Sequence, residues 1–319
     1  SLISASFGPA LPRAIRALSE RLHVTPYVVL LAAFQTLMHR YTGQDDIIVG
    51  STTTGRTQSE LANVVGYFVN PVPIRTRFAD QIRFRELVQQ VQQSVLGALA
   101  NQDFPFVSIV ERLRPPRSTI ARPPIYQVMF TQQRSHLLYQ EGLSQLALSR
   151  EGISVDLGGL PMEGVTLRQR MSPFDLTMQV TDSEADLGAA IEFNIDLFDE
   201  STVERMLGHY RTLLEGVVDD PDGVVAHLPI LTPAEIAQLK AWSYTSCIPL
   251  ADTCIHHAFE AQVERTPEAP AVRFASPAAA ATPQPQERGN HLTYRELDQR
   301  ANQLAHHLRG LGVGPDVLV

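Results

Sequence analysis

Cysteine and histidine side chains gather around residue 250 and raise the question of a metal centre. Cys247, Cys254, His256 and His257 lie close together in the chain. Their spacing matches no common zinc pattern, and on a helix His256 and His257 would point about 100° apart. The chain has no Gly-x-x-x-x-Gly-Lys-Ser/Thr phosphate loop, no Gly-x-Ser-x-Gly nucleophile elbow and no His-Glu-x-x-His zinc helix. We therefore predict no metal site here.

Length and composition predict a globular chain of about two units. It has 319 residues, 44% of them hydrophobic, and a net charge of −8. An acidic balance offers no overall attraction to nucleic acid or to an anionic membrane. Its two cysteines indicate no disulfide framework and fit a reducing cytosol. No apolar stretch is long enough to span a bilayer and no secretory signal is present, so we expect a cytoplasmic location.

The first half of the chain predicts a core helix followed by two strands. Thr25 and Pro26 open a helix whose residues 27–41 are apolar nearly all round, so it should be central to the core. Asp46–Gly50 follows as a short buried strand. Residues 64–78 are expected to be extended, and Pro71 and Pro73 make that segment an edge or irregular strand.

Further periodic segments complete an α/β pattern up to a break at residues 219–223. They predict helices over 82–100 and 201–218 and strands over 125–131, 176–180 and 189–195. A capping box at Thr232–Glu235 opens a short helix over 233–242 inside an ordered linker. Beyond it we expect a helix over 253–264, a strand over 271–274, a mobile loop at about 275–290 and a helix from 293.

Several stretches in one order resemble the condensation and then the adenylation domain of a nonribosomal peptide synthetase. The family pattern Gly-Phe-Phe-Val-Asn-Thr stands here as Gly66-Tyr-Phe-Val-Asn70-Pro71, and His/Asn-Gln-Asp-x-Pro-Phe-Glu stands as Asn101 to Phe106 followed by Val107. Also similar to the family are Tyr41–Gly50, Ser172–Thr177, Asn194–Phe198 and Leu292–Asn302.

The resemblance covers essentially the whole chain and implies its fold and domains. Residues 1–228 resemble the C-terminal lobe of a condensation domain, an α/β lobe like chloramphenicol acetyltransferase, with a mixed sheet and helices. Residues 229–250 resemble the linker, and 251–319 the truncated start of an adenylate-forming domain. Because the first residue is not Met and the last three resemble a strand, we expect both ends to be cut.

The catalytic motif of the family, His-His-x-x-x-Asp-Gly, belongs to the other, N-terminal lobe. The pairs His256-His257 and His306-His307 are followed by Ala261-Gln262 and Leu311-Gly312 where the motif has Asp-Gly. Peptide-bond formation in the family needs the second histidine of this motif near the attacking amine. The resemblance therefore implies no catalytic residue here and an inactive fragment of an active parent enzyme.

Four polar residues are implied to lie near the tunnel between the lobes: Asn70, Gln102, Asp103 and Asp175. Their amides and carboxylates could hydrogen-bond the phosphopantetheine arm that carries the substrate. The alternative is structural: Asn70 ends a strand, Asp103 caps the segment that follows, and Asp175 stabilises the lobe. We favour the structural roles over direct contact.

An arginine-rich segment is a second candidate site. Where the family has Arg-Asp-x-Ser-Arg-Asn-Pro-Leu, this chain keeps only Arg122 and Pro124. The positive patch that could meet an acidic carrier protein or a phosphate consists of Arg112, Arg114, Arg117 and Arg122. Such a run is more often only a solvated face.

The resemblance implies that the parent condenses a carrier-bound acyl or peptidyl donor with a carrier-bound aminoacyl acceptor. Phosphopantetheine would come with the carrier domains, and ATP would serve only the missing part of the adenylation domain. Partners would be the carriers, the missing lobe and the rest of the adenylation domain. Two alternatives stay open: a docking or scaffold module for a carrier, and a free-standing acyltransferase using His136 or His209.

Overall fold

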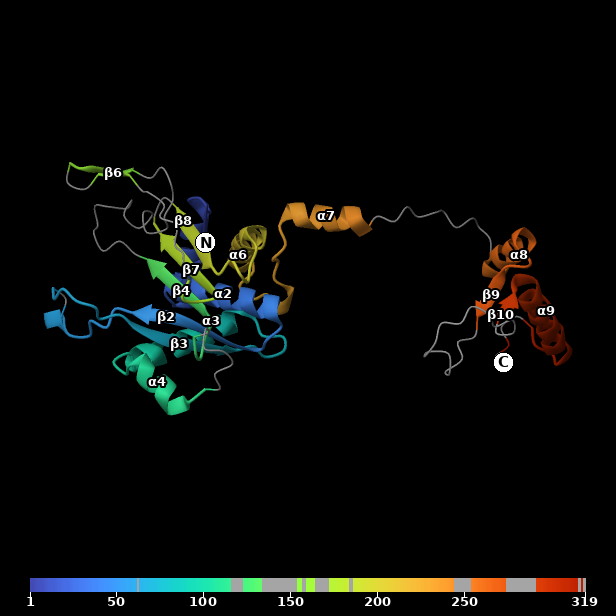
Figure 1. Cartoon of the computed structure of the whole chain (residues 1–319), viewed down its shortest axis with the longest axis horizontal. Helices are drawn as coiled ribbons and strands as arrows, with labels where there is room; N and C mark the ends of the chain where they lie inside the picture. Colours follow the sequence, from blue (N-terminus) through green and yellow to red (C-terminus); the bar gives the residue numbers. More distant parts are fainter. Residues whose placement is uncertain are drawn as a thin grey trace. The chain divides into compact units, whose positions relative to one another are not determined.

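The computed structural model describes residues 1–61, 63–115, 123–133, 154–156, 159–163, 172–183, 186–243, 254–273, 291–314 and 317. The chain divides into two compact units, Ser1–Ala241 and Trp242–Val319. Figure 1 draws the first unit in blue to yellow, with its last helix in orange, and the helices and strands of the second unit in darker orange to red.

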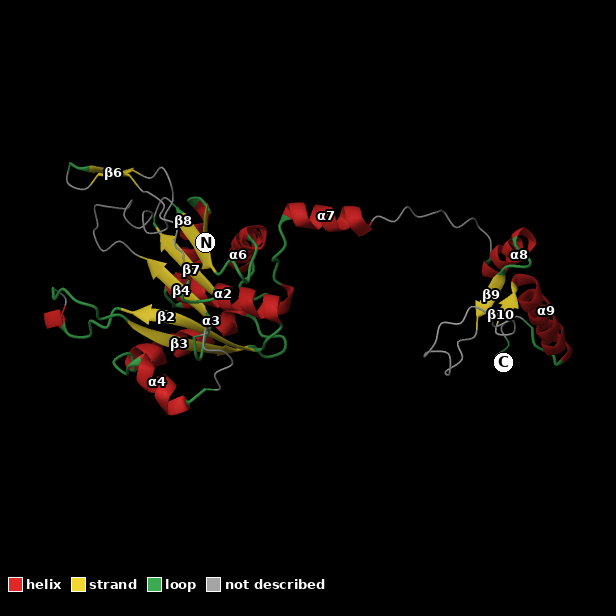
Figure 2. Ribbon diagram, in the orientation of Figure 1, coloured by secondary structure: helices red, strands yellow, loops and turns green. Residues whose placement is uncertain are grey.

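The first unit is built on a six-stranded mixed sheet (Figure 2). Its strand order is β1-β8-β7-β4-β2-β3, with β2, β4 and β7 parallel and the other pairs antiparallel. The strands are β1 (Leu2–Ser6), β2 (Asp46–Thr53), β3 (Asn70–Arg77), β4 (Val128–Gln133), β7 (Leu176–Asp182) and β8 (Leu187–Phe193). The predicted mixed sheet with helices is confirmed.

Helices cover one face of this sheet and enclose the core. They are α1 (Ala10–Leu22), α2 (Pro26–Thr42), α3 (Phe84–Ala100) and α6 (Glu200–Asp219). The central helix is α2, in which every residue from Val28 to Met38 is buried, as its apolar sequence predicted. Tyr210 of α6 donates a hydrogen bond across the core to the Leu30 carbonyl of α2, at 3.0 Å.

Shorter elements complete the first unit. These are η1 (Ser59–Leu61), α4 (Phe106–Leu113), the hairpin β5 (Ser154–Asp156) and β6 (Pro161–Glu163), and η2 (Val225–His227). The second unit, with α8 (Ile255–Arg265), β9 (Pro270–Arg273), β10 (His291–Thr293) and α9 (Tyr294–Gly310), matches the predicted helix, strand and helix closely. The loop predicted at about 275–290 lies outside the described residues.

Three strand predictions need correction at their ends, and the first is the strand predicted over 189–195, which is β8 and spans Leu187–Phe193. The prolines correctly placed β3 at the edge of the sheet, but only Asn70–Arg77 is strand and residues 64–69 belong to a loop. The strand predicted from Ile125 begins at Val128, because Ile125 has a φ of 76° that interrupts an extended chain.

No single helix among the described residues is long and apolar enough to cross a bilayer. Helices α1 and α2 meet the length and hydropathy criteria only when they are taken together, and the chain bends by 102° at the break between them.

A buried histidine ties helix α7 (Pro233–Ser243) to helices of the sheet unit. His209 Nε2 lies 2.9 Å from both carboxylate oxygens of Glu235, and its Nδ1 lies 2.7 Å from the Tyr41 hydroxyl. Since a carboxylate only accepts, Nε2–H donates to Glu235, and in the neutral ring Nδ1 then accepts from the Tyr41 hydroxyl. Glu235 also accepts from the Thr232 amide at 2.8 Å, in the predicted capping box. The contacts give His209 a structural role.

Glu235 should make the docking of α7 depend on pH. Burial raises the pKa of its carboxyl, but hydrogen bonds from Thr232 and His209 outweigh burial and hold it below its usual 4.5. A carboxyl with a lowered pKa stabilises the folded state above pH 4.5 and loses that contribution as the pH falls through the lowered value. In Glu235→Gln, amides 236–242 should lose about fivefold of their hydrogen-exchange protection at pH 7, the effect of losing about 1 kcal/mol of capping.

Glu215→Gln is the matched control, because Glu215 pairs with Arg211 on the exposed face of α6. It should leave the exchange of α7 unchanged. Equal protection of α7 in Glu235→Gln and Glu215→Gln would refute this role for Glu235.

Candidate functional site

Asn70 holds the turn between α3 and α4 against the end of the sheet. Its Nδ2 donates to the backbone carbonyls of Gln102 at 2.8 Å and Phe104 at 2.9 Å. Its Oδ1 accepts from the Phe106 amide at 3.3 Å. Pro71 restricts Asn70 to the extended conformation from which its side chain reaches this turn. We call this arrangement the Asn70 staple.

The staple brings three of the four predicted tunnel residues together. Gln102 contributes its backbone carbonyl, and Asp103 Oδ1 lies 3.4 Å from the Thr57 hydroxyl, on the loop between β2 and β3. The hydrogen bonds of Asn70 go to backbone groups, and Asn70 begins strand β3 rather than ending a strand. Direct contact of these residues with a substrate arm stays a prediction.

Asp175 lies toward the opposite end of the parallel strands. In the parallel strands, Gly50 of β2 pairs with Met129 of β4, and Val128 of β4 pairs with Leu176, the first residue of β7. Asp175 therefore lies just before the start of β7. Asn70, by contrast, pairs with Thr53, the last residue of β2. The Asp175 amide donates to the Gln127 carbonyl at 2.9 Å, which joins β7 to the start of β4. Its placement in a tunnel stays a prediction.

A row of three aromatic rings runs from the first residue of α4 to the residue before Asp175. The ring of Phe106 lies 5.3 Å from that of Tyr126, which lies 5.6 Å from that of Phe174, next to Asp175. Burial raises the pKa of Tyr126 to about 12, so its hydroxyl is neutral at physiological pH. Sequence analysis missed this row, although Phe106 and Phe174 lie inside the motifs it quoted.

The loop between β2 and β3 presents apolar side chains from a built framework. Arg56 donates to the Val64 carbonyl at 2.8 Å and its guanidinium lies 4.4 Å from the centre of the Phe68 ring. At the tip, Val65 is 100% exposed and Tyr67 is 88% exposed. These contacts hold the Val65 and Tyr67 side chains out at the tip of the loop.

Of the predicted arginine patch, Arg112 and Arg114 lie exposed at the end of α4. Arg117 and Arg122 lie outside the described residues, as does His136. The carrier-binding role of the patch stays a prediction.

The cysteine and histidines of the second unit lie closer together than the sequence predicted. The ligand atoms of Cys254, His256 and His257 are all within 4.8 Å of one another, and the three residues are exposed. His256 and His257 rings stand 4.1 Å apart, because their side chains turn toward each other rather than along the directions of an ideal helix. Nothing else among the described residues points to a metal at this place.

Replacing Asn70 by alanine should destabilise the first unit by about 1–2 kcal/mol, because three backbone groups of the 102–106 turn lose their partner. Urea unfolding followed by circular dichroism measures this loss. Asn101→Ala is the control, since Asn101 donates one exposed hydrogen bond, to Gly97, and should cost less than about 0.5 kcal/mol. Equal losses in the two variants would contradict the staple.

Comparison with known proteins identifies the family. Residues 2–240 match the condensation domain family and residues 259–319 match the AMP-binding enzyme family. The chain belongs to the condensation domain family and continues into the start of an AMP-binding enzyme, as the motifs indicated. The family match treats residues 2–240 as a condensation domain without dividing it into lobes, so it does not bear out the narrower prediction of a C-terminal lobe.

Curated relatives are synthases many times longer than this chain. The chain is 37% identical over 310 residues to chondramide synthase cmdD of Chondromyces crocatus and 33% identical over 313 residues to tyrocidine synthase 3 of Brevibacillus parabrevis. These matches cover 97% and 98% of this chain but only 7% and 4% of those proteins.

Solved structures confirm the predicted fold, which resembles chloramphenicol acetyltransferase. A four-domain nonribosomal peptide synthetase bound to AMP and glycine matches 98% of this chain with a TM-score of 0.69 and 20% identity, over 23% of its own length. The first condensation domain of the calcium-dependent antibiotic synthetase matches 72% of this chain with a TM-score of 0.57 and 19% identity. This match covers 47% of that condensation domain.

Proposed function

We propose that residues 1–228 are the C-terminal, acceptor-side lobe of a condensation domain in a nonribosomal peptide synthetase. Residues 229–250 would then be the linker and 251–319 the start of the adenylation domain. Two matches to solved domains support this division. In each match, 72% of this chain is aligned, and it covers 47% of one condensation domain and 50% of the X-domain from teicoplanin biosynthesis. The aligned part of this chain therefore corresponds to about half of each solved domain.

The parent enzyme joins a carrier-bound acyl or peptidyl donor to a carrier-bound aminoacyl acceptor. The acceptor amine attacks the donor thioester, a carbon–nitrogen bond forms, the carbon–sulfur bond breaks, and the amine's proton ends on the departing thiol. Both substrates would reach this cytoplasmic enzyme on the phosphopantetheine arms of carrier domains. ATP would be needed only by the rest of the adenylation domain.

In this proposal the chain lines the site, and the N-terminal lobe supplies the imidazole of the His-His-x-x-x-Asp-Gly motif. His209 is engaged at both ring nitrogens by Tyr41 and Glu235, which argues against its use as a free base. Asn70 is committed to the 102–106 turn and would position that turn rather than take a proton. We therefore expect no amide formation by the chain alone.

The observation that carries this proposal is the exposed apolar tip of the β2–β3 loop, with Val65 and Tyr67 presented on a held framework. We expect it to contact the missing lobe. The test is to add the separately expressed N-terminal half of a condensation domain, containing His-His-x-x-x-Asp-Gly, and to map amide hydrogen exchange on the full chain.

Saturable binding with protection at residues 64–69 is the expected result, and Tyr67→Asp should weaken it. Tyr294→Asp is the control, since Tyr294 lies in the second unit. Protection confined to α1 and α6, or no binding at all, would overturn the lobe assignment. Binding of a loaded carrier protein without the N-terminal half would instead favour a docking module.

A further inference from the structure

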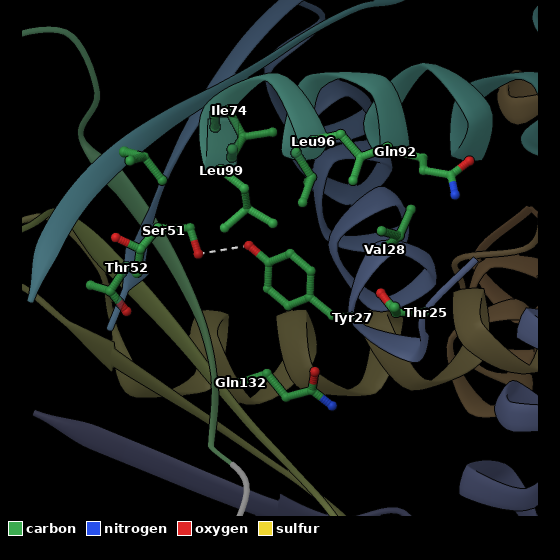
Figure 3. A pocket seen from close by; sticks show the side chains of 14 residues that line it. Thr25, Tyr27, Val28, Ser51, Thr52, Ile74, Gln92, Leu96, Leu99 and Gln132 are labelled. Carbon is green, nitrogen blue, oxygen red and sulfur yellow. Dashed lines mark hydrogen bonds between the residues drawn. The ribbon is translucent and has the colours of Figure 1, made fainter. Parts of the chain in front are cut away.

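A cavity of about 310 Å³ lies between the helices and the splayed end of the sheet (Figure 3). We call it the splay pocket. It is lined by α2, α3, β2, β3 and β4 through Thr25, Tyr27, Val28, Ser51, Thr52, Thr53, Val72, Ile74, Gln92, Val95, Leu96, Ala98, Leu99 and Gln132.

The pocket exists because strands β2 and β4 diverge. They share one register pair, Gly50 with Met129, whereas β2 stays paired with β3 to Thr53 and β4 with β7 to Gln133. Ser51 Oγ donates to the Phe130 carbonyl at 3.0 Å and accepts from the Tyr27 hydroxyl at 2.7 Å. Beyond this link the strands diverge and leave a space that the side chains do not fill.

The lining is neutral and largely apolar. None of its described side chains carries a charge, and burial raises the pKa of the Tyr27 phenol, outweighing its hydrogen bond to Ser51. A charged ligand group would lose its hydration here without a counter-charge, which is costly. The occupant is therefore neutral, and Val28, Val95 and Leu99 favour a hydrocarbon chain.

One polar atom of the lining lacks a partner. Gln132 Nε2 is buried and has no hydrogen-bond acceptor among the residues that the structure describes. A buried amide donor left unpaired is destabilising, and native proteins usually satisfy it. The Nε2 atom is closed off from the cavity itself, so a carbonyl oxygen on the occupant would satisfy it only after the Gln132 side chain turns toward the pocket.

The pocket adjoins the Asn70 staple. Thr53, which lines the pocket, pairs with Asn70 and donates to its carbonyl at 3.2 Å. Ala98 and Leu99 lie in the last turn of α3, just before Gln102, and the exposed Leu96 and Leu99 mark the mouth. The apolar portion of a substrate held near the Asn70 staple would therefore lie close to the opening of the splay pocket at Leu96 and Leu99.

We propose that the splay pocket binds the neutral, apolar acyl or side-chain portion of a thioester-linked substrate, with Gln132 donating to a carbonyl oxygen. This assignment rests on the proposed function for its substrate class. Since a 150 Å³ cavity accommodates benzene, a volume of 310 Å³ accommodates about a dozen heavy atoms. An eight-carbon acyl chain with its carbonyl fits this size.

The test compares octanoyl-pantetheine with acetyl-pantetheine by calorimetric titration of the full chain. Each buried methylene is worth about a fourfold gain in affinity, so octanoyl should bind at least about tenfold more tightly than acetyl. Ala98→Phe fills the pocket and should abolish the preference. Ala100→Phe, the same change at an exposed position of α3 outside the lining, should keep it.

Leu96→Trp at the exposed mouth is the second blocking variant, and it decides the question if Ala98→Phe fails to fold. An unmodified chain with no chain-length preference, or a folded blocking variant that keeps it, would overturn the proposal. A preference without binding of the N-terminal half would overturn the lobe assignment but leave the pocket. Binding of that half without a preference would overturn only the pocket.

Discussion

Replacing Gly50 by alanine is expected to destabilise the first unit by about 2–3 kcal/mol, the upper part of the range of about 1–3 kcal/mol that is usual for overpacking a filled site. A Cβ at this position would overlap Cε2 of Tyr126. That ring is 2% exposed and packs between Phe106 and Phe174, so it has little room to move. Urea unfolding of the full chain, followed by circular dichroism, measures the change.

Two further variants isolate the cause. Gly97→Ala is the control, because an added Cβ there meets nothing within 4 Å and the helix should gain up to about 1 kcal/mol. In a double-mutant cycle, Gly50→Ala combined with Tyr126→Ala should cost at least about 1 kcal/mol less than the sum of the two single changes. An additive cycle would mean that the ring does not limit residue 50.

Replacing Phe130 by alanine is expected to cost about 3–5 kcal/mol, the usual loss for a buried phenylalanine. Phe130 is fully buried on β4, and its ring lies 5.6 Å from Phe34 and 5.7 Å from Tyr27 of α2. Its removal opens a cavity between sheet and central helix, next to the splay pocket. The same urea titration measures the loss.

Phe104→Ala provides the matched control for this deletion. Phe104 is 46% exposed in the turn before α4, so its truncation should cost less than about 1 kcal/mol. Comparable losses from Phe104→Ala and Phe130→Ala would contradict the placement of the core between α2 and β4.

Local chemistry explains the elements that the sequence predicted well. The apolar run after Thr25 and Pro26 could only be a buried helix, and Pro71 and Pro73 exclude β3 from the interior of a sheet because proline lacks the amide donor. Helix α1 was missed although Leu11, Ile15 and Leu18 carry its periodic stripe. Helix α4 was missed too, since its Phe106 was considered only as part of a motif.

The site depends on contacts that no local pattern encodes. Asn70 meets Gln102 and Phe104 across an edge strand and a whole helix, and the splay pocket requires β2 and β4 to diverge after one register pair. Resemblance pointed to Asn70, Gln102 and Asp103 without showing that the Asn70 amide is occupied by backbone. The aromatic row and Gln132 emerge only from the folded chain.

The proposed function requires that this chain lines a peptide-forming site whose imidazole comes from another segment. Amide formation between an acyl-loaded and an aminoacyl-loaded carrier protein, followed by mass spectrometry, tests it most directly. We expect no amide above background with the chain alone and product when the His-His-x-x-x-Asp-Gly half is added. Replacing the second histidine of that half by alanine should lower the rate at least about 100-fold. Amide formed by the chain alone would contradict it.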